Sequence, residues 1–378
     1  MTILWDARAA YLYPGTGLGT YSRQILLQFL QSGLNSSGLA LEYWSPHRRV
    51  SPYQLRKDLI VLSNSLSKDP RFWSNLVEHP VKAKGDQIVH LPNNGLGGQA
   101  TLGAKQVVTI HDLIPLILPE TCSKEYLRIF ASEMPRILER STKIIAVSEH
   151  TRRDIERTYQ IPTRFISVIH EAPDPIYRPL NSEATRTVLA EGYGLDYPFL
   201  LYVGGFSPRK NLTALIRAFA RVRKDLVTPH LLVILGLPGK GSYPDCRKLV
   251  SRLRLERWVR FPGFIPTRLL PLFYNAASSF IYPSLYEGFG LPPIEAMACG
   301  TPTITSNRSS LPEVVGEGAL QVDPDPISLA EAIADVINQP EIAEKLHKLG
   351  LQRVKEFSWR TAAQHLNDLY TELLGGEK

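Results

Sequence analysis

Short runs of apolar residues alternate with amphipathic stretches along most of the chain. The runs are too short for helices, and we interpret them as buried strands. The predicted strands are residues 3–5, 107–110, 143–147, 199–203, 231–235, 259–261, 279–282, 303–305 and 320–322. The predicted helices are residues 21–30, 123–138, 149–159, 212–222, 247–255, 328–337 and 359–374. This alternation is typical of parallel sheets with helices on both faces, so the sequence predicts an α/β fold.

A chain of 378 residues suits two domains of average size. The break is expected near residues 174–180, where two prolines resist both helix and central strand. The predicted domains are residues 1–177 and 178–357, and residues 358–378 form a last helix. Each domain is expected to be a doubly wound sheet, in which ligands bind at the carboxyl ends of the strands.

The composition, 44% hydrophobic and 21% charged, is that of an ordinary globular protein. No apolar run approaches the roughly 18 to 20 residues that span a bilayer, and the N-terminus does not resemble a signal peptide. The three cysteines are isolated and suggest neither a metal site nor a disulfide framework. We therefore expect a cytoplasmic protein.

The net charge is +7, and residues 1–180, with 21 Lys and Arg against 16 Asp and Glu, carry +5 of it. A basic stretch at 136–164 could meet an anionic membrane or a phosphorylated acceptor. A solvated helix face is the simpler interpretation and the one that we favour. Peripheral contact with the inner face of a membrane stays open, and no nucleic-acid partner is expected.

The stretch from Glu287 to Glu295 is the most informative part of the sequence, because it joins a strand end, a glycine loop and a helix start. Pro292 and Pro293 fit a first helical turn, and Gly300 fits the stop. Free N–H groups at such a helix start suit a phosphate. An ionised carboxylate only accepts hydrogen bonds, so two carboxylates beside a phosphate need hydroxyl groups as donors. The sequence therefore predicts a site for a sugar nucleotide.

Arg209 and Lys210 follow the predicted strand 199–203 and precede another helix. Cations at a helix start oppose the helix dipole, so we favour a functional reason for them. They can neutralise a diphosphate and the charge that develops on it.

His111 lies at the carboxyl end of the strand 107–110. A neutral imidazole there can bond a substrate hydroxyl or carry a proton, and a buried structural histidine is an equal alternative.

The glycines 15, 17 and 19 follow the first strand and precede the helix 21–30. They fit either a loop that approaches a phosphate or a turn that needs positive φ. Their spacing is a poor dinucleotide fingerprint. Asp323 and Asp325 form an Asp-x-Asp sequence, which we interpret as turn and cap residues, not as metal ligands.

These motifs, in this order, resemble the retaining glycosyltransferases of family 4 over nearly the whole chain. The match includes the early glycines, His111 with Asp112 and Leu113, residues 146–151, residues 209–211, 261–264, 287–295 and 311–314. The resemblance implies a GT-B fold, in which two Rossmann-like domains face each other across a cleft and the last helix crosses back to the first domain. It implies a metal-independent enzyme without a cofactor, acting on a nucleotide-diphosphate sugar.

The resemblance also assigns roles to single residues. Glu295 is expected to bind the ribose hydroxyls, and Glu287 to touch the donor sugar. Arg209 and Lys210 are expected to hold the diphosphate, and His111 to face the transferred sugar. Further substrate contacts are implied for Gly17, Gly19, Gly263, Phe264, Ile265, Phe289, Gly290 and Leu291. Many relatives carry an arginine where this chain has Gly205, and Arg209 is expected to supply the missing charge.

The residues around His111 resemble bacterial mannosyltransferases, so GDP-mannose is favoured slightly as the donor. A UDP-glucose-dependent enzyme of the sucrose-phosphate synthase kind is an alternative. The acceptor stays open between a saccharide, a lipid-linked acceptor and a sugar phosphate. A sugar-nucleotide binding protein without catalysis and a dinucleotide oxidoreductase are further alternatives. The retained Glu287, Lys210 and His111 argue against the first, and the glycine spacing argues against the second.

Overall fold

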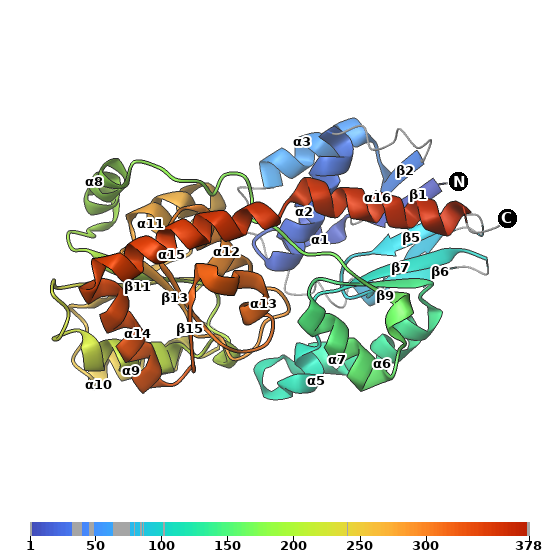
Figure 1. Ribbon diagram of the computed structural model, residues 1–378. Helices are drawn as coiled ribbons and strands as arrows, with labels where there is room; N and C mark the ends of the chain where they lie inside the picture. The colour runs from blue at the N-terminus through green and yellow to red at the C-terminus, as the bar shows by residue number, and fades with distance from the viewer. Residues whose placement is uncertain are drawn as a thin grey trace. The chain divides into compact units, whose positions relative to one another are not determined.

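The computed structural model describes residues 2–31, 40–44, 49–62, 76–78, 80–83, 85, 87–100, 103–239 and 241–375. The chain divides into two compact units. Unit 1 consists of Met1–Glu171 and Ser358–Lys378, and unit 2 consists of Ala172–Phe357. The division therefore falls six residues before the predicted boundary between residues 177 and 178. Each unit is built on one main sheet (Figure 1).

The sheet of unit 1 has seven strands, all parallel to their neighbours except β3. In spatial order these are β3 (Arg49–Val50), β2 (Ala40–Trp44), β1 (Thr2–Asp6), β5 (Gln87–Leu91), β7 (Lys105–Ile110), β8 (Lys143–Ala146) and β9 (Ile166–Val168). A small second sheet pairs β4 (Val81–Ala83) with β6 (Gly98–Ala100). The order reverses between β1 and β5, which makes this a doubly wound sheet.

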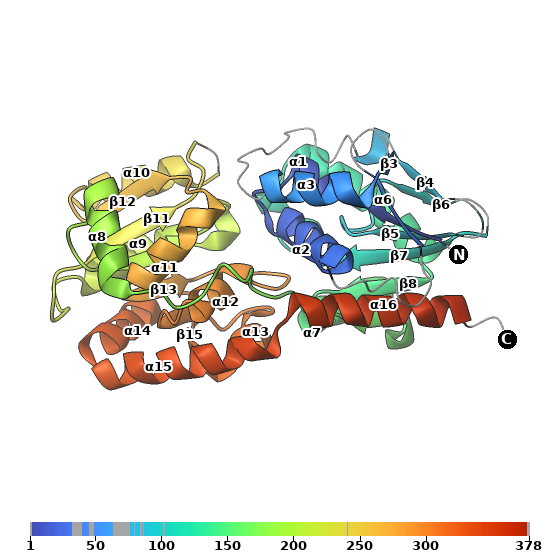
Figure 2. The ribbon, with the colours of Figure 1, turned by 90° about the horizontal axis from the view of Figure 1, so that it is seen from above.

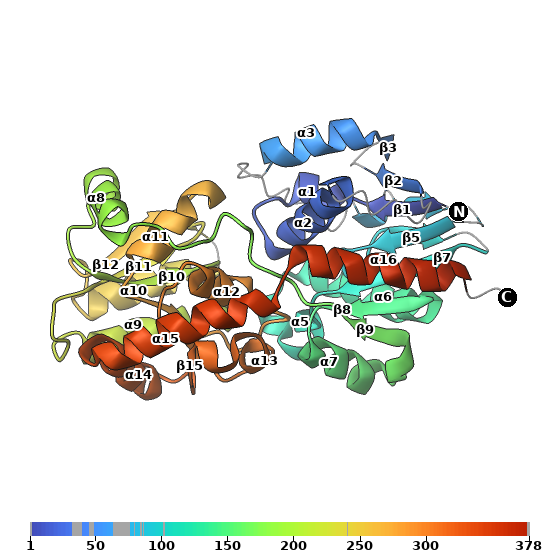
Figure 3. The same ribbon diagram turned by 45° about the horizontal axis from the view of Figure 1, so that its top comes forward.

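Helices cover both faces of the unit 1 sheet (Figure 3). One face carries α1 (Arg8–Leu12), α2 (Gly17–Gln31), α3 (Pro52–Leu62) and α16 (Trp359–Gly375). The other carries α5 (Ile114–Ile117), α6 (Lys124–Arg140) and α7 (Glu149–Tyr159). Helix α16 lies along α2 (Figure 2), and its Tyr370 hydroxyl bonds His90 Nδ1 on β5. The last helix is thus part of the core of unit 1.

The sheet of unit 2 has six parallel strands. In spatial order these are β12 (Val259–Gly263), β11 (Leu231–Leu235), β10 (Phe199–Val203), β13 (Ser279–Tyr282), β14 (Thr303–Ser306) and β15 (Leu320–Val322). Helices α9 (Leu212–Val222), α10 (Tyr243–Arg252) and α14 (Pro326–Asn338) lie on one face. Helices α8 (Ser182–Tyr193), α11 (Leu270–Ala276) and α12 (Leu291–Ala298) lie on the other. The remaining helices are α13 (Leu311–Val315) and α15 (Pro340–Arg353).

The two parallel, helix-covered sheets confirm the predicted α/β class. Strands β10, β11, β13 and β15 have the predicted bounds, as do helices α7 and α9. Helix α10 begins four residues before its predicted start, because Pro244 fits its first turn. No helix in the described part of the chain is both long and apolar enough to cross a bilayer.

Candidate functional site

The strand order of unit 2 reverses between β10 and β13, and the candidate residues gather in the loops that follow these two strands. The loop after β10 carries Arg209 and Lys210, and the loop after β13 carries Glu287. Neighbouring parallel strands end at the same edge of a sheet, and doubly wound sheets bind ligands where their order reverses. The topology therefore brings together the cations and the carboxylate that the sequence singles out.

The carboxylate of Glu287 is buried between both cations. Its Oε2 lies 2.8 Å from Nη1 of Arg209, and its Oε1 lies 2.5 Å from Nζ of Lys210. Ser284 Oγ donates to the same Oε1 at 2.5 Å. Lys210 Nζ also donates to the hydroxyl of Tyr282, the last residue of β13. The guanidinium of Arg209 thus supplies positive charge here although no arginine stands at Gly205.

Burial of Glu287 opposes its ionisation, but the charges of Arg209 and Lys210 outweigh this and lower its pKa to about 2. The group is therefore ionised at neutral pH. One carboxylate against two cations leaves the cluster with a net positive charge. That balance suits an anionic ligand such as a diphosphate.

The loop between β13 and α12 is held in one shape. Gly290 has a φ of +112°, and a Cβ there would lie 2.7 Å from Leu311 Cδ2. Ser310 Oγ donates to the carbonyls of Glu287 and Phe289 at 2.9 and 2.7 Å. Helix α12 then begins at Leu291 with prolines in its first turn, which confirms the predicted helix start. Gly300, with a φ of +77°, follows its end as predicted.

Glu295 lies on α12 and is also buried. The hydroxyl of Tyr274 donates to its Oε2 at 3.0 Å, which fixes the direction of the carboxylate. Glu287 and Glu295 therefore both belong to unit 2, and each has a defined hydrogen-bond partner.

Three residues with an implied substrate contact, Gly263, Phe264 and Ile265, lie at the end of the edge strand β12 and directly after it. Gly263 has a φ of +90°, and a Cβ added there would meet no other atom within 4 Å, so the glycine is needed for its backbone conformation alone. Its carbonyl accepts from Gly236 N at 3.0 Å, which ties this loop to the end of β11. Phe264 is half-buried and Ile265 is buried.

The structure corrects the expectation for the early glycines. The short helix α1 separates them from β1, and Gly17 and Gly19 lie inside the first turns of α2, not in a loop before it. Neither has positive φ in the described structure. A Cβ on Gly19 would lie 2.2 Å from the carbonyl oxygen of Tyr13, so this glycine is required by close backbone packing. Gly17 is exposed at the helix start.

His111 lies directly after β7 in unit 1, where both of its ring nitrogens have protein partners. Nε2 lies 2.9 Å from the carbonyl oxygen of Pro92, and Nδ1 lies 3.1 Å from Oε1 of Glu171. Asn94 Oδ1 accepts from the His111 N–H at 2.7 Å. The ring is buried, with only 7% of the residue exposed.

Sequence reasoning missed several residues that hold these side chains. They are Tyr282, Ser284 and Ser310 around the Glu287 loop, Tyr274 at Glu295, and Glu171 at His111. Ser284 and Tyr282 stand at the end of a predicted strand, which was a usable signal. Glu171 is 60 residues from His111 in sequence, and no local pattern joins them.

The structure confirms that Asp325 is a helix cap. Its Oδ1 accepts from the N–H groups of Ile327 and Ser328 at the start of α14, at 2.8 and 3.1 Å. Asp323 instead pairs with Arg308 at 2.8 Å on the surface. The two aspartates thus serve separate structural purposes.

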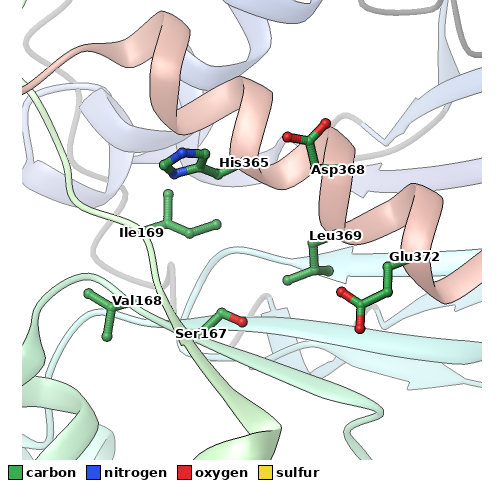
Figure 4. A pocket seen from close by; sticks show the side chains of 7 residues that line it. All are labelled: Ser167, Val168, Ile169, His365, Asp368, Leu369 and Glu372. Atoms are coloured by element: carbon green, nitrogen blue, oxygen red, sulfur yellow. The ribbon is translucent and has the colours of Figure 1, made fainter.

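A separate pocket of about 310 Å³ lies in unit 1 between β9 and α16 (Figure 4). It is lined by Ser167, Val168, Ile169, His365, Asp368, Leu369 and Glu372. None of the predicted site residues lines it. Its titratable side chains are exposed and belong to one face of α16.

Family models of glycosyltransferases match two successive parts of the chain. Residues 15–175 match the family model "Glycosyltransferase Family 4", and residues 190–353 match "Glycosyl transferases group 1". The chain is 29% identical to O-antigen chain mannosyltransferase B of Escherichia coli, over 95% of this chain and 96% of that protein. It is 30% identical to the serotype-specific mannosyltransferase WbdA of Escherichia coli over 72% of its length, which spans 34% of that longer relative.

Among solved structures, sucrose-phosphate synthase from Thermosynechococcus elongatus superposes with a TM-score of 0.74. All of both chains is covered, at 23% sequence identity. This likeness shows the fold, which is that of the GT-B glycosyltransferases. The chain therefore consists of a Glycosyltransferase Family 4 domain followed by a Glycosyl transferases group 1 domain, the two parts of a GT-B glycosyltransferase.

Proposed function

We propose that this protein is a retaining hexosyltransferase that moves a sugar, with mannose from GDP-mannose favoured, onto an acceptor hydroxyl in the synthesis of a polysaccharide or glycolipid. The observation that carries the proposal is the buried Glu287 between Arg209 and Lys210 at the point where the sheet order of unit 2 reverses. The mannosyltransferase named among the relatives supports mannose. The likeness to sucrose-phosphate synthase concerns the fold alone, so the UDP-glucose alternative has weaker support.

In the proposed reaction the bond from the anomeric carbon to the diphosphate breaks, and a bond to the acceptor oxygen forms on the same face of the sugar. Arg209, Lys210 and the N–H groups at the start of α12 stabilise the negative charge on the leaving diphosphate. The acceptor proton passes to that diphosphate. Unit 1 is assigned to the acceptor, which is a saccharide, a lipid-linked saccharide or a sugar phosphate.

Thermal-shift and calorimetric screening against UDP, GDP and ADP, followed by their sugars, tests the proposal. We expect GDP and GDP-mannose to raise the melting temperature most. Proton NMR of the product made from the preferred donor then reports the anomeric configuration, which should be that of the donor. A chain that binds none of these nucleotides, or a product with inverted configuration, would contradict the proposal.

Replacement of Glu295 by alanine is expected to weaken donor binding. A hydrogen bond from a neutral group to a carboxylate is worth about 1.5–3 kcal/mol, so the dissociation constant of the donor should rise about tenfold to a hundredfold. Isothermal titration with the preferred nucleotide sugar measures this. The variant E331A, which removes an exposed carboxylate on α14, is the matched control and should bind normally. Unchanged donor affinity in E295A would contradict the ribose assignment.

We propose further that the transfer needs no metal, because two side-chain cations are available to neutralise the diphosphate. Assays in excess EDTA should therefore give the same rate as assays with added Mg²⁺ or Mn²⁺. A rate that disappears with the chelator and returns with one of these ions would overturn this part of the proposal.

A further inference from the structure

Helix α3 has an exposed apolar surface on the outside of unit 1, next to α1 and α2 (Figures 1 and 3). Leu55 and Leu59 lie on its inner face and are fully buried. Tyr53, Ile60 and Val61 lie on the opposite side, with 79%, 58% and 66% of these residues exposed. Their spacing of i, i+7 and i+8 puts them on one helix face. Single exposed apolar side chains are common on soluble proteins, but three on one face indicate a contact surface.

Two cations stand among these apolar side chains. Arg56 and Lys57 are exposed on the same face of the helix. The one carboxylate of α3, Asp58, is held at the edge of this face: its Oδ2 accepts from the Tyr11 hydroxyl at 2.8 Å, and its Oδ1 accepts from the Gln54 amide at 2.6 Å. The surface is therefore both apolar and positively charged. We call it the α3 outer face, and it consists of Tyr53, Arg56, Lys57, Ile60 and Val61.

The basic stretch at 136–164 differs from this surface, because its charges are partly paired. On α7, Arg152 pairs with Glu149 and Glu156 at 2.6 and 3.1 Å. The large apolar side chains of α7, a helix that the structure describes over its whole length, are buried or half-buried. That helix thus offers compensated charge without an exposed apolar face. Of the two basic surfaces, the α3 outer face is the one that suits a lipid surface.

A second copy of the chain and an anionic membrane are the two partners to compare. In a symmetric dimer the α3 outer face would meet itself, and Arg56 and Lys57 would face the same cations without a carboxylate to pair with. An anionic lipid surface supplies negative charge to the cations. Its acyl boundary accepts the apolar side chains, as it does for amphipathic helices that lie on membranes. Charge complementarity therefore favours the membrane.

We propose that unit 1 binds the surface of an anionic lipid bilayer through the α3 outer face. The apolar side chains enter the headgroup region, and the two cations lie among anionic headgroups. Because the inner face of α3 is already packed on unit 1, the helix docks without refolding. This binding does not depend on the proposed transferase activity. One consequence rests on that activity: unit 1 is assigned to the acceptor, so a membrane-bound unit 1 favours the lipid-linked acceptor of the three.

Flotation of the full chain with lipid vesicles tests the binding directly. Vesicles of phosphatidylcholine with about a third of phosphatidylglycerol should bind the wild type, and vesicles of phosphatidylcholine alone should bind little of it. Added salt should weaken the binding, because it screens the headgroup charge. A wild type that floats with neither kind of vesicle overturns the proposal without any need for a variant.

Removal of the two cations tests the location of the surface. One Lys or Arg near an anionic membrane contributes about fivefold to the partition coefficient, so R56Q/K57Q should bind at least about tenfold more weakly. The matched control R153Q/R157Q removes two exposed arginines from α7 and changes the net charge equally. It should bind within about twofold of the wild type. All four side chains are exposed, so melting temperatures should not change. Equal losses in the two double variants would overturn the role of α3.

A fluorescent reporter tests whether the α3 outer face enters the lipid. In Tyr53→Trp the added indole should be quenched by brominated lipid in the vesicles. In Tyr197→Trp, which replaces a tyrosine of unit 2 that is 52% exposed, it should not be quenched. The signal of the five native tryptophans is subtracted with the wild type as reference. Absence of quenching in Y53W while the wild type floats would place the contact elsewhere and overturn the proposal.

Analytical ultracentrifugation without lipid tests the second copy as a partner. We expect the same mass for the wild type and for I60S/V61S. A dimer that becomes a monomer in I60S/V61S would assign the α3 outer face to a second copy of the chain and overturn the proposal. If the wild type bound anionic vesicles but none of the nucleotides or their sugars, the proposed function would fail and the membrane surface would stand.

Discussion

Replacement of Lys210 by alanine is expected to lower turnover about a hundredfold or more. Lys210 Nζ is held by the Tyr282 hydroxyl and by Glu287, so its charge is fixed before any ligand binds. Loss of one such preorganised donor costs roughly 3–4 kcal/mol of transition-state stabilisation, by analogy with an oxyanion hole. Steady-state kinetics with the preferred donor measures the effect, which should appear in kcat more than in KM.

The matched control is K224A, which removes an exposed lysine from the same unit and should leave kcat unchanged. K210A should remain folded, because Glu287 keeps Arg209 as its partner at 2.8 Å. A melting curve establishes this before the kinetics are interpreted. Near-normal turnover of folded K210A would remove Lys210 from the diphosphate site.

Replacement of Glu287 by glutamine is expected to destabilise the ligand-free protein by about 2–3 kcal/mol. The change leaves Arg209 and Lys210, only 18% and 11% exposed, without their shared counter-charge. Removal of one partner from a buried ion pair costs roughly 3–5 kcal/mol, and the partial exposure of the cations places this case at or just below the lower end of that range. For a unit of this size the melting temperature should fall by about 5–10 °C.

The difference in stability between the wild type and E287Q is expected to depend on pH. The folded-state pKa of Glu287 is about 2, below its ordinary value of 4.5, so its stabilisation is complete above about pH 4.5 and is lost as the pH falls towards 2. The difference in melting temperature between wild type and E287Q should therefore shrink on acidification. D323N, which breaks the exposed pair with Arg308, is the control and should cost less than about 1 kcal/mol at any pH. Equal stability of E287Q and wild type at neutral pH would contradict the buried cluster.

Strands could be predicted from the sequence where they are continuous apolar runs, as in β10 and β11. Strand β5 was missed because polar residues interrupt it: His90 is buried there and bonds Thr109 Oγ1 at 2.8 Å as well as Tyr370. These partners are distant in sequence, so the sequence of β5 alone does not indicate that the strand is buried. Strand β9, Ile166–Val168, was also missed.

In the candidate site, too, the features that depend on neighbouring residues were predicted and those that depend on distant contacts were not. Glu287, Gly290 and Pro292 belong to one continuous segment, and local rules for loops and helix starts placed them correctly. The early glycines were misplaced because glycine was read as a loop residue, whereas Gly19 is needed for the contact of α2 with the Tyr13 carbonyl. That contact depends on how the chain folds back through α1, which periodicity does not reveal.

The return of α16 to unit 1 determines the order in which the nascent protein can be completed. The ribosome delivers Trp359, Leu366 and Tyr370, all buried in unit 1, only after every residue of unit 2. Until then the apolar surface that these side chains cover stays open to water, while unit 2 already has all of its strands. Although domains generally mature in the order of their synthesis, here the unit that starts first must finish last.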